Sequence, residues 1–190
     1  IEAGREASVD EGKPYIITYA GNIGSGQGLE KIIPEAAKRL GKDYQFRLIG
    51  DGGTRKKLEE KLKELNVQNV ELLNPVARKE LIQYYKERTF LFFHLNDLEA
   101  FKKVMPSKMF EYGAFDKPII AGVGGFAAQF VEKNIPNHIL FKPTDVDDFV
   151  SQMKAYQLKF ERRDDFIKNF SRMSIDEKLA ESIVGLLPVA

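Results

Sequence analysis

Residues 15–41, YIITYAGNIGSGQGLEKIIPEAAKRLG, contain the first complete strand-and-helix unit that the sequence predicts. The run at 15–21 is apolar, has the length of a buried strand and stops at a glycine. A glycine-rich loop follows. Residues 28–41 then carry apolar side chains at helical spacing, with Gly41 as a stop signal. The stretch therefore predicts a strand, a glycine-rich turn and a helix.

This alternation continues along the chain. Further strand-like runs lie at 44–50, 69–73, 89–95, 117–122 and 138–142. Helix-like runs lie at 54–66, 78–87, 107–115, 126–134 and 144–160. Because the strand-like runs are nearly all apolar, we expect a parallel sheet covered on both faces. The predicted fold class is α/β, a Rossmann-like three-layer sandwich with a parallel sheet of about six strands. Its strand-to-helix loops share one edge, where ligands bind in such folds.

Two capping-box patterns predict helix starts in the second half of the chain. Thr144 and Asp147 form one, and Ser174 and Glu177 form the other. We expect the helix that follows the second box to lie outside the sheet core and to contact a partner. Its apolar stripe consists of Ile175, Leu179 and Ile183.

The chain divides into three predicted parts. We expect a linker at 1–14, a Rossmann-like domain at 15–160 and a helical tail at 161–190. The phenylalanine spacing within 159–173 indicates either a membrane-surface helix or a segment that packs back on its own domain, and we favour packing. The first residues show neither an initiator methionine nor a signal-peptide pattern. We therefore interpret the sequence as one domain of a longer protein.

Composition excludes several kinds of site. The net charge of +1 gives no sign of a nucleic-acid-binding field, so we expect no nucleic-acid partner. The absence of cysteine excludes disulfides, thiolate zinc sites and thiol nucleophiles, and it fits a cytoplasmic protein. His94 and His138 are the only histidines and lie far apart in sequence, so we expect no metal site. His94 ends an apolar strand, and we interpret it as structural.

Four loops at the expected ligand edge are rich in small residues: 21–28, 50–54, 96–107 and 122–125. Glycine lets backbone N–H groups approach a ligand, and a helix start adds partial positive charge. For any one loop taken alone, a tight turn is the favoured explanation. Together the four loops favour a phosphate-bearing nucleotide.

The usual nucleotide motifs nevertheless fail at residues that carry their chemistry. A P-loop needs Lys and Ser/Thr where Gln27 and Gly28 stand. As a dinucleotide fingerprint, Gly24, Gly26 and Gly28 place the third glycine one position early. Asp51 does imitate the ribose-binding acid of that fingerprint. The chain has no Tyr-x-x-x-Lys pair, which a short-chain dehydrogenase would need.

The segment PSKMFEYGAF, residues 106–115, answers better. Ser107 is a suitable N-cap, and free N–H groups near Lys108 and Met109 could receive phosphate oxygens. Glu111 falls about one turn later, where a carboxylate could accept hydrogen bonds from a ribose diol. The alternative interpretation of Glu111 is a solvated helix carboxylate.

The chain resembles the carboxyl-terminal, donor-binding domain of retaining GT-B glycosyltransferases of family 4, particularly members that build bacterial surface polysaccharides. The order and spacing of its segments carry the resemblance: YAGNIGSGQGLEKII, FRLIGDGG, NVELLNPV, PSKMFEYGAFDKPIIAGVGG and ILFKPTDVDDF. The resemblance implies a hexosyltransferase-type enzyme whose substrate is a nucleoside-diphosphate sugar. It implies no cofactor, no obligatory metal and no catalytic residue that could be named in this half.

The resemblance also implies roles for individual residues. Glu111 would bind the ribose, the backbone at 107–109 and 124–126 would hold the diphosphate or the sugar, and 74–76 would lie against the base. The candidate donor-binding residues are Asn22, Gly24, Gly50, Asp51, Asn74, Val76, Ser107, Lys108, Met109, Glu111, Gly124, Gly125 and Phe126.

Two departures from the family pattern concern charge. Asn22 and Gln27 stand where many members carry Arg and Lys, and Lys103 replaces the first of two paired glutamates. The phosphate charge must then be met by Lys108, Lys102 or Lys103. Lys108 is the best candidate because it lies at a helix start. Lys102 and Lys103 are equally well read as a solvated charge pair.

The predicted protein is thus the donor half of a glycosyltransferase that moves a sugar to a lipid-linked or saccharide acceptor. The acceptor domain would precede this chain, so the half alone should be inactive. We expect it in the cytoplasm, with peripheral attachment to the inner face of the membrane as a possibility. The alternatives are a non-catalytic nucleotide-binding or regulatory module of the same fold and, less favoured, an NAD-dependent oxidoreductase.

Overall fold

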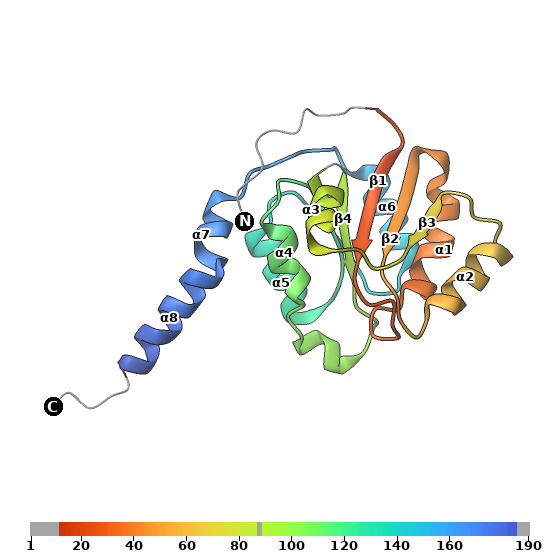
Figure 1. Cartoon of the computed structure of the whole chain (residues 1–190). Helices are drawn as coiled ribbons and strands as arrows, with labels where there is room; N and C mark the ends of the chain where they lie inside the picture. The colour runs from red at the N-terminus through yellow and green to blue at the C-terminus, as the bar shows by residue number, and fades with distance from the viewer. Residues whose placement is uncertain (1–11, 87–88, 186–190) are drawn as a thin grey trace.

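The protein, described by a computed structural model over residues 12–86 and 89–185, contains one six-stranded parallel sheet (Figure 1). The strands are β1 (Tyr15–Ala20), β2 (Tyr44–Ile49), β3 (Val70–Leu73), β4 (Phe90–His94), β5 (Ile119–Gly122) and β6 (His138–Phe141), in the order β3-β2-β1-β4-β5-β6. Each strand coincides with a predicted apolar run to within two residues. The predicted fold class is confirmed.

Helices cover both faces of the sheet (Figure 1). They are α1 (Leu29–Leu40), α2 (Arg55–Glu64), α3 (Arg78–Lys86), α4 (Ser107–Gly113), α5 (Gly125–Asn134), α6 (Val146–Ala155), α7 (Asp164–Phe170) and α8 (Arg172–Val184), with 3-10 turns η1 (Gly41–Asp43) and η2 (Glu99–Lys103). One core joins α1, α2 and α6 to one face, and a second core joins α3, α4, α5 and α7 to the other.

Strand pairing locates the edge where a ligand can enter. β1 pairs with β2 over all six residues, but with β4 only at Ile17–Phe90 and Thr18–Leu91. β1 and β4 therefore separate beyond Thr18. The order of strands along the chain reverses between these two strands. Ligand crevices form at this switch point in open α/β sheets. The Tyr112 hydroxyl enters the gap and accepts a hydrogen bond from the Ala20 N–H at 3.3 Å.

The two capping predictions are wrong by one and three residues. The N-cap of α6 is Asp145, whose carboxylate accepts from the Asp148 N–H at 2.9 Å, and the helix ends at Ala155 rather than at 160. An ionised carboxylate accepts this hydrogen bond better than the Thr144 hydroxyl would. In α8 the N-cap is Ser171, which accepts from the Ser174 N–H, so Ser174 lies inside the helix.

The tail divides into a packed part and an exposed part. The Phe166 ring is buried, and a Cβ on Gly113 would lie 2.2 Å from it, so α7 packs directly on α4. Phe170 contacts the ring of Phe110, as predicted for a segment that packs on its own domain. α8 has no buried residue and extends away from the sheet (Figure 1). That its apolar stripe meets a partner stays a prediction, and most of the predicted linker lies outside the described residues.

A buried arginine, Arg163, binds the tail to the segment that follows α4. Arg163 donates to the carbonyl oxygens of Phe115 and Lys117, and its Nε donates to Asn137 Oδ1 at 3.0 Å. Asn137 in turn donates from Nδ2 to Asp116 O at 2.9 Å. The sequence analysis did not identify this arginine, because its partners are backbone carbonyls that no pattern marks.

Candidate functional site

Loops from four strands meet at the carboxyl edge of the sheet. A cavity of about 300 Å³ lies there, between the ends of β1 and β2 and the loop that follows β3. Its lining consists of Ala20, Gly21, Asn22, Ile49, Gly50, Asp51, Pro75, Val76 and Leu81. Four of the predicted site residues, Asn22, Gly50, Asp51 and Val76, therefore share one hollow. Its lining is mostly aliphatic with exposed backbone, which suits a flat, weakly polar ring.

Lys108 belongs to α4, and its side chain lies against Gly21 at the end of β1. Its Nζ lies 5.7 Å from the centre of the Tyr19 ring and 5.5 Å from that of Tyr112. A Cβ on Gly21 would lie 2.7 Å from Lys108 Cε, so the glycine leaves the lysine its place. Burial lowers the pKa of Lys108, and the nearby Glu111 partly opposes this. Within residues 12–86 and 89–185, no carboxylate forms an ion pair with it.

Glu111 lies one turn further along α4 and is partly exposed. Burial raises the pKa of Tyr85, and the negative charge of Glu111 adds to this. Over the part of the chain that the structure describes, no hydrogen bond or ion pair to the Glu111 carboxylate is formed. An ammonium and a carboxylate on one helix thus both retain bonding capacity toward a ligand.

The start of α4 differs from the prediction in two respects. Pro106, in extended conformation, is the N-cap, and Ser107 is the first helical residue without a capping bond from its side chain. The Met109 N–H donates to Pro106 O at 3.1 Å, and its side chain is buried. Only the N–H groups of Ser107 and Lys108 are therefore left for phosphate oxygens.

The first glycine-rich loop is neutral and internally bonded. Asn22 Nδ2 donates to Gln27 Oε1 at 3.1 Å, and Asn22 O accepts from the Tyr19 hydroxyl at 2.5 Å. A Cβ on Gly24 would lie 2.6 Å from Asn22 Nδ2, so Gly24 makes room for this amide pair. The two residues that replace basic side chains of the family pattern hence bond to each other.

An arginine that sequence reasoning missed organises the neighbouring loops. Arg55 donates from Nη1 to Gly50 O at 2.7 Å and to Asn74 Oδ1 at 3.0 Å. It thereby joins the loops after β2 and β3. Asn74 is turned toward Arg55, whereas Val76 lines the cavity. The carboxylate of Asp51 accepts from the Gly52 N–H at 2.8 Å, which shapes the same turn. The available signal was a basic residue at the start of the helix in the second strand–loop–helix unit.

The residues after β5 lie apart from this cavity. A Cβ on Gly125 would lie 2.1 Å from Lys102 O, so the backbone of η2 covers the first turn of α5. Gly124 and Lys102 help to line a separate hollow of about 80 Å³. The Phe126 side chain is 56% exposed. Lys102 is exposed and pairs with Glu99 at 2.5 Å.

His94 is buried at the end of β4, as the structural interpretation predicts. Its Nδ1 lies 2.6 Å from Gln27 O, and the Thr144 N–H donates to its Nε2 at 3.0 Å. Burial lowers the pKa of His94 to about 4, partly opposed by the bond to Gln27. Neither bond was predictable from the sequence.

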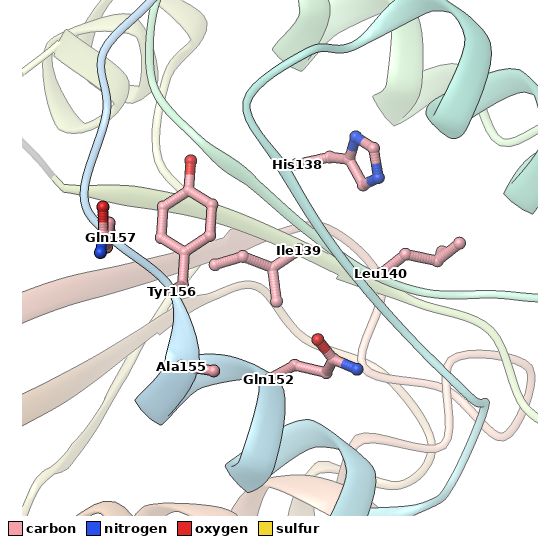
Figure 2. Close-up of a pocket in the computed structure, with 7 residues that line it drawn as sticks. All are labelled: His138, Ile139, Leu140, Gln152, Ala155, Tyr156 and Gln157. Carbon is pink, nitrogen blue, oxygen red and sulfur yellow. The ribbon is translucent and has the colours of Figure 1, made fainter.

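Two other hollows contain none of the predicted residues. One, of about 330 Å³, runs between β6 and the end of α6, and Figure 2 shows His138, Gln152 and Tyr156 around it. The other, of about 460 Å³, lies where β1 and β2 begin. Both are at least as large as the cavity at the carboxyl edge.

In the described part of the chain, no three His, Asp or Glu side chains lie close enough together to hold a metal ion. No helix there combines the length and apolar character that crossing a membrane requires.

The sequence matches the family described as Glycosyl transferases group 1 over residues 1–173. The chain belongs to this family. A relative in Methanocaldococcus jannaschii, named as an uncharacterized glycosyltransferase, is 26% identical over 183 residues, which cover 88% of this chain and 47% of the relative.

Solved structures share the fold of this chain. The lipopolysaccharide outer core galactosyltransferase WaaB superposes with a TM-score of 0.73 at 19% identity, over 94% of this chain and 51% of WaaB. Anabaena HepE in complex with UDP superposes with a TM-score of 0.75 at 17% identity, over 92% of this chain and 50% of HepE. The chain thus spans about half the length of each of these three proteins.

Proposed function

We propose that this chain is the donor-binding half of a hexosyltransferase-type glycosyltransferase, whose substrate is a nucleoside-diphosphate sugar. The observation that carries the proposal is α4, which presents Lys108 and Glu111 one turn apart, with no ion-pair partner for either among the described residues. Lys108 contacts Gly21, which lines the cavity at the ends of β1 and β2. That HepE was solved with UDP supports the same ligand class.

Each part of a nucleoside diphosphate has a chemical counterpart at this edge. The diphosphate would lie at Lys108 and at the N–H groups of Ser107 and Lys108, where a charge-assisted hydrogen bond is strongest. Glu111 would accept both hydroxyls of the ribose. The base would enter the aliphatic cavity beside Val76 and Gly50. Contact of residues 124–126 with the sugar stays a prediction.

During transfer, negative charge grows on the departing diphosphate. A preorganised ammonium in a water-poor site stabilises such charge without a metal. Lys108, held between two tyrosine rings, would have this role. The acceptor, lipid-linked or saccharide, and the remaining catalytic groups would belong to the half that this chain does not include, so this half alone should not transfer sugar.

The finer assignment rests on the resemblance and the half-length match. We place the chain as the carboxyl-terminal half of a retaining, family 4-like enzyme of bacterial surface polysaccharide synthesis, acting at the cytoplasmic face of the membrane. Lys103, where the family carries a glutamate, favours the second candidate, a nucleotide-binding module without catalysis.

The test is a calorimetric titration of the chain with UDP, UDP-glucose, GDP-mannose and NAD. We expect binding of one nucleoside diphosphate and its sugars, and no binding of NAD. Saturable binding of NAD alone would contradict the proposal. Joining the chain to its missing half and assaying sugar transfer separates the enzyme from the non-catalytic module.

A further inference from the structure

The His94 ring is buried and closely packed on its neighbours. The ring is only 1% exposed and stacks parallel to Phe141, with centroids 5.8 Å apart and planes at 12°. A Cβ on Gly122 would lie 2.3 Å from His94 Cδ2, so the neighbouring strand provides a glycine where the ring passes. The side chain therefore has one orientation, and its two nitrogens face fixed partners.

Both partners of the ring belong to loops at the ligand edge. Gln27 O can only accept, so the nitrogen 2.6 Å from it, Nδ1, must carry a hydrogen. The Thr144 N–H can only donate, so Nε2 must present its lone pair at 3.0 Å. Only the neutral ring with its hydrogen on Nδ1 satisfies both bonds. The low pKa of His94 keeps the ring in this form at neutral pH.

The bond to Gln27 holds the loop at residues 21–28, which contacts Lys108 through Gly21. Gln27 pairs through its side chain with Asn22, which follows Gly21, and Gly21 contacts the Lys108 side chain. The bond to Thr144 acts elsewhere, on a β-branched residue with φ of 62° that precedes α6. One ring thus connects the first glycine-rich loop to the loop after β6.

We propose that His94 is a positioning residue for donor binding: by holding Gln27 through Nδ1–H, it fixes loop 21–28 over Lys108. It does not touch the ligand and acts only through the loop. The inference rests on the proposed function, because it assumes that a nucleoside diphosphate binds beside Lys108.

Two substitutions separate the two bonds. In His94→Asn, the side-chain amide nitrogen stands near the place of Nδ1 and can still donate to Gln27 O, but the bond to Thr144 is lost. In His94→Gln, the terminal amide reaches toward Thr144, but nothing replaces Nδ1–H. Both variants remove the same ring and end in the same amide group, and they differ by one methylene, so each is the control for the bond that the other keeps.

UDP affinity and thermal unfolding are measured for the wild type and both variants, well below each melting temperature. We expect His94→Gln to weaken UDP binding by about tenfold, and His94→Asn by no more than about twofold. A purely structural histidine would lower both melting temperatures and leave the affinity of the folded protein unchanged. Equal affinities of the two folded variants would overturn the proposal.

The outcome remains decisive if His94→Gln does not fold. In ¹⁵N spectra of the wild type, the imidazole should show its hydrogen on Nδ1 near neutral pH, and a hydrogen on Nε2 would overturn the proposal. If the wild type binds no nucleotide, the donor site itself is refuted. If the wild type binds UDP and folded His94→Gln binds it equally, only the role of His94 is refuted.

Discussion

Replacing Lys108 with methionine removes one positive charge and keeps most of the side-chain volume. Lys108 has no carboxylate partner among the described residues, and burial lowers its pKa. Its ammonium is therefore held at some cost in the free protein, and that cost is recovered when an anion binds. Methionine can occupy the same space between the rings of Tyr19 and Tyr112, so we expect the free energy of unfolding to change by less than about 1 kcal/mol.

The size of the binding defect follows from the charge and its exposure. Two unit charges about 4 Å apart attract by about 4 kcal/mol at an effective dielectric constant of about 20. Because Lys108 is partly exposed, solvent weakens this attraction to about 1.5–3 kcal/mol, the range typical of hydrogen bonds to charged groups. We therefore expect UDP to bind about 10- to 100-fold more weakly to Lys108→Met.

The assay compares UDP with uridine by calorimetry at constant ionic strength. The loss should be confined to UDP, because uridine carries no phosphate. Lys102→Met is the matched control, since Lys102 is exposed and paired with Glu99, and it should change UDP affinity by less than about threefold. Equal weakening of UDP and uridine by Lys108→Met, or no weakening of either, would refute the phosphate role.

Three other changes probe separate parts of the account. Glu111→Ala should weaken UDP about 10- to 100-fold but should not weaken 2′,3′-dideoxy-UDP, which lacks the diol; titrations in which both ligands respond alike would argue against ribose binding. The pKa of His94 is about 4 in the folded protein against an ordinary 6.5, so the stabilisation that the neutral ring contributes is complete above pH 6.5 and is lost as the pH falls toward 4. The loss amounts to about 3 kcal/mol, and the free energy of urea unfolding of His94→Asn should depend less on pH over that interval. A pH dependence equal to that of the wild type would be evidence against a buried neutral ring. Arg163→Met leaves buried carbonyls unpaired and should lower the free energy of unfolding by about 3 kcal/mol. The control Arg162→Met removes an exposed ion pair with Asp164 and should change it by less than about 0.5 kcal/mol. Similar urea midpoints for the two variants would argue against the stabilising role of Arg163.

The fold was predictable because its signals are local. Strands such as β4, with five consecutive buried residues, read as apolar runs whatever the tertiary context. Capping was less predictable, because Thr144 and Asp145 compete for one helix start and the choice depends on geometry that the sequence does not encode. The same holds for α4, where Pro106 and not Ser107 precedes the helix.

The site was predictable in its residue types but not in its connections. A lysine and a glutamate one turn apart on a helix are visible in the sequence, and the structure brings both to the expected edge. That Asn22 pairs with Gln27, or that Arg55 holds Asn74, depends on contacts between loops distant in the chain. Such side-chain-to-backbone and side-chain-to-side-chain bonds follow only from the assembled sheet.

The central claim is that a nucleoside diphosphate binds at the carboxyl edge, between α4 and the ends of β1 and β2. The most direct test is a titration of the ¹⁵N-labelled chain with UDP, followed through its backbone amide resonances. The account predicts the largest shifts at Gly21, Gly50, Val76 and Lys108. Shifts confined to the hollow beside His138 and Tyr156 (Figure 2), or to the hollow where β1 and β2 begin, would contradict it.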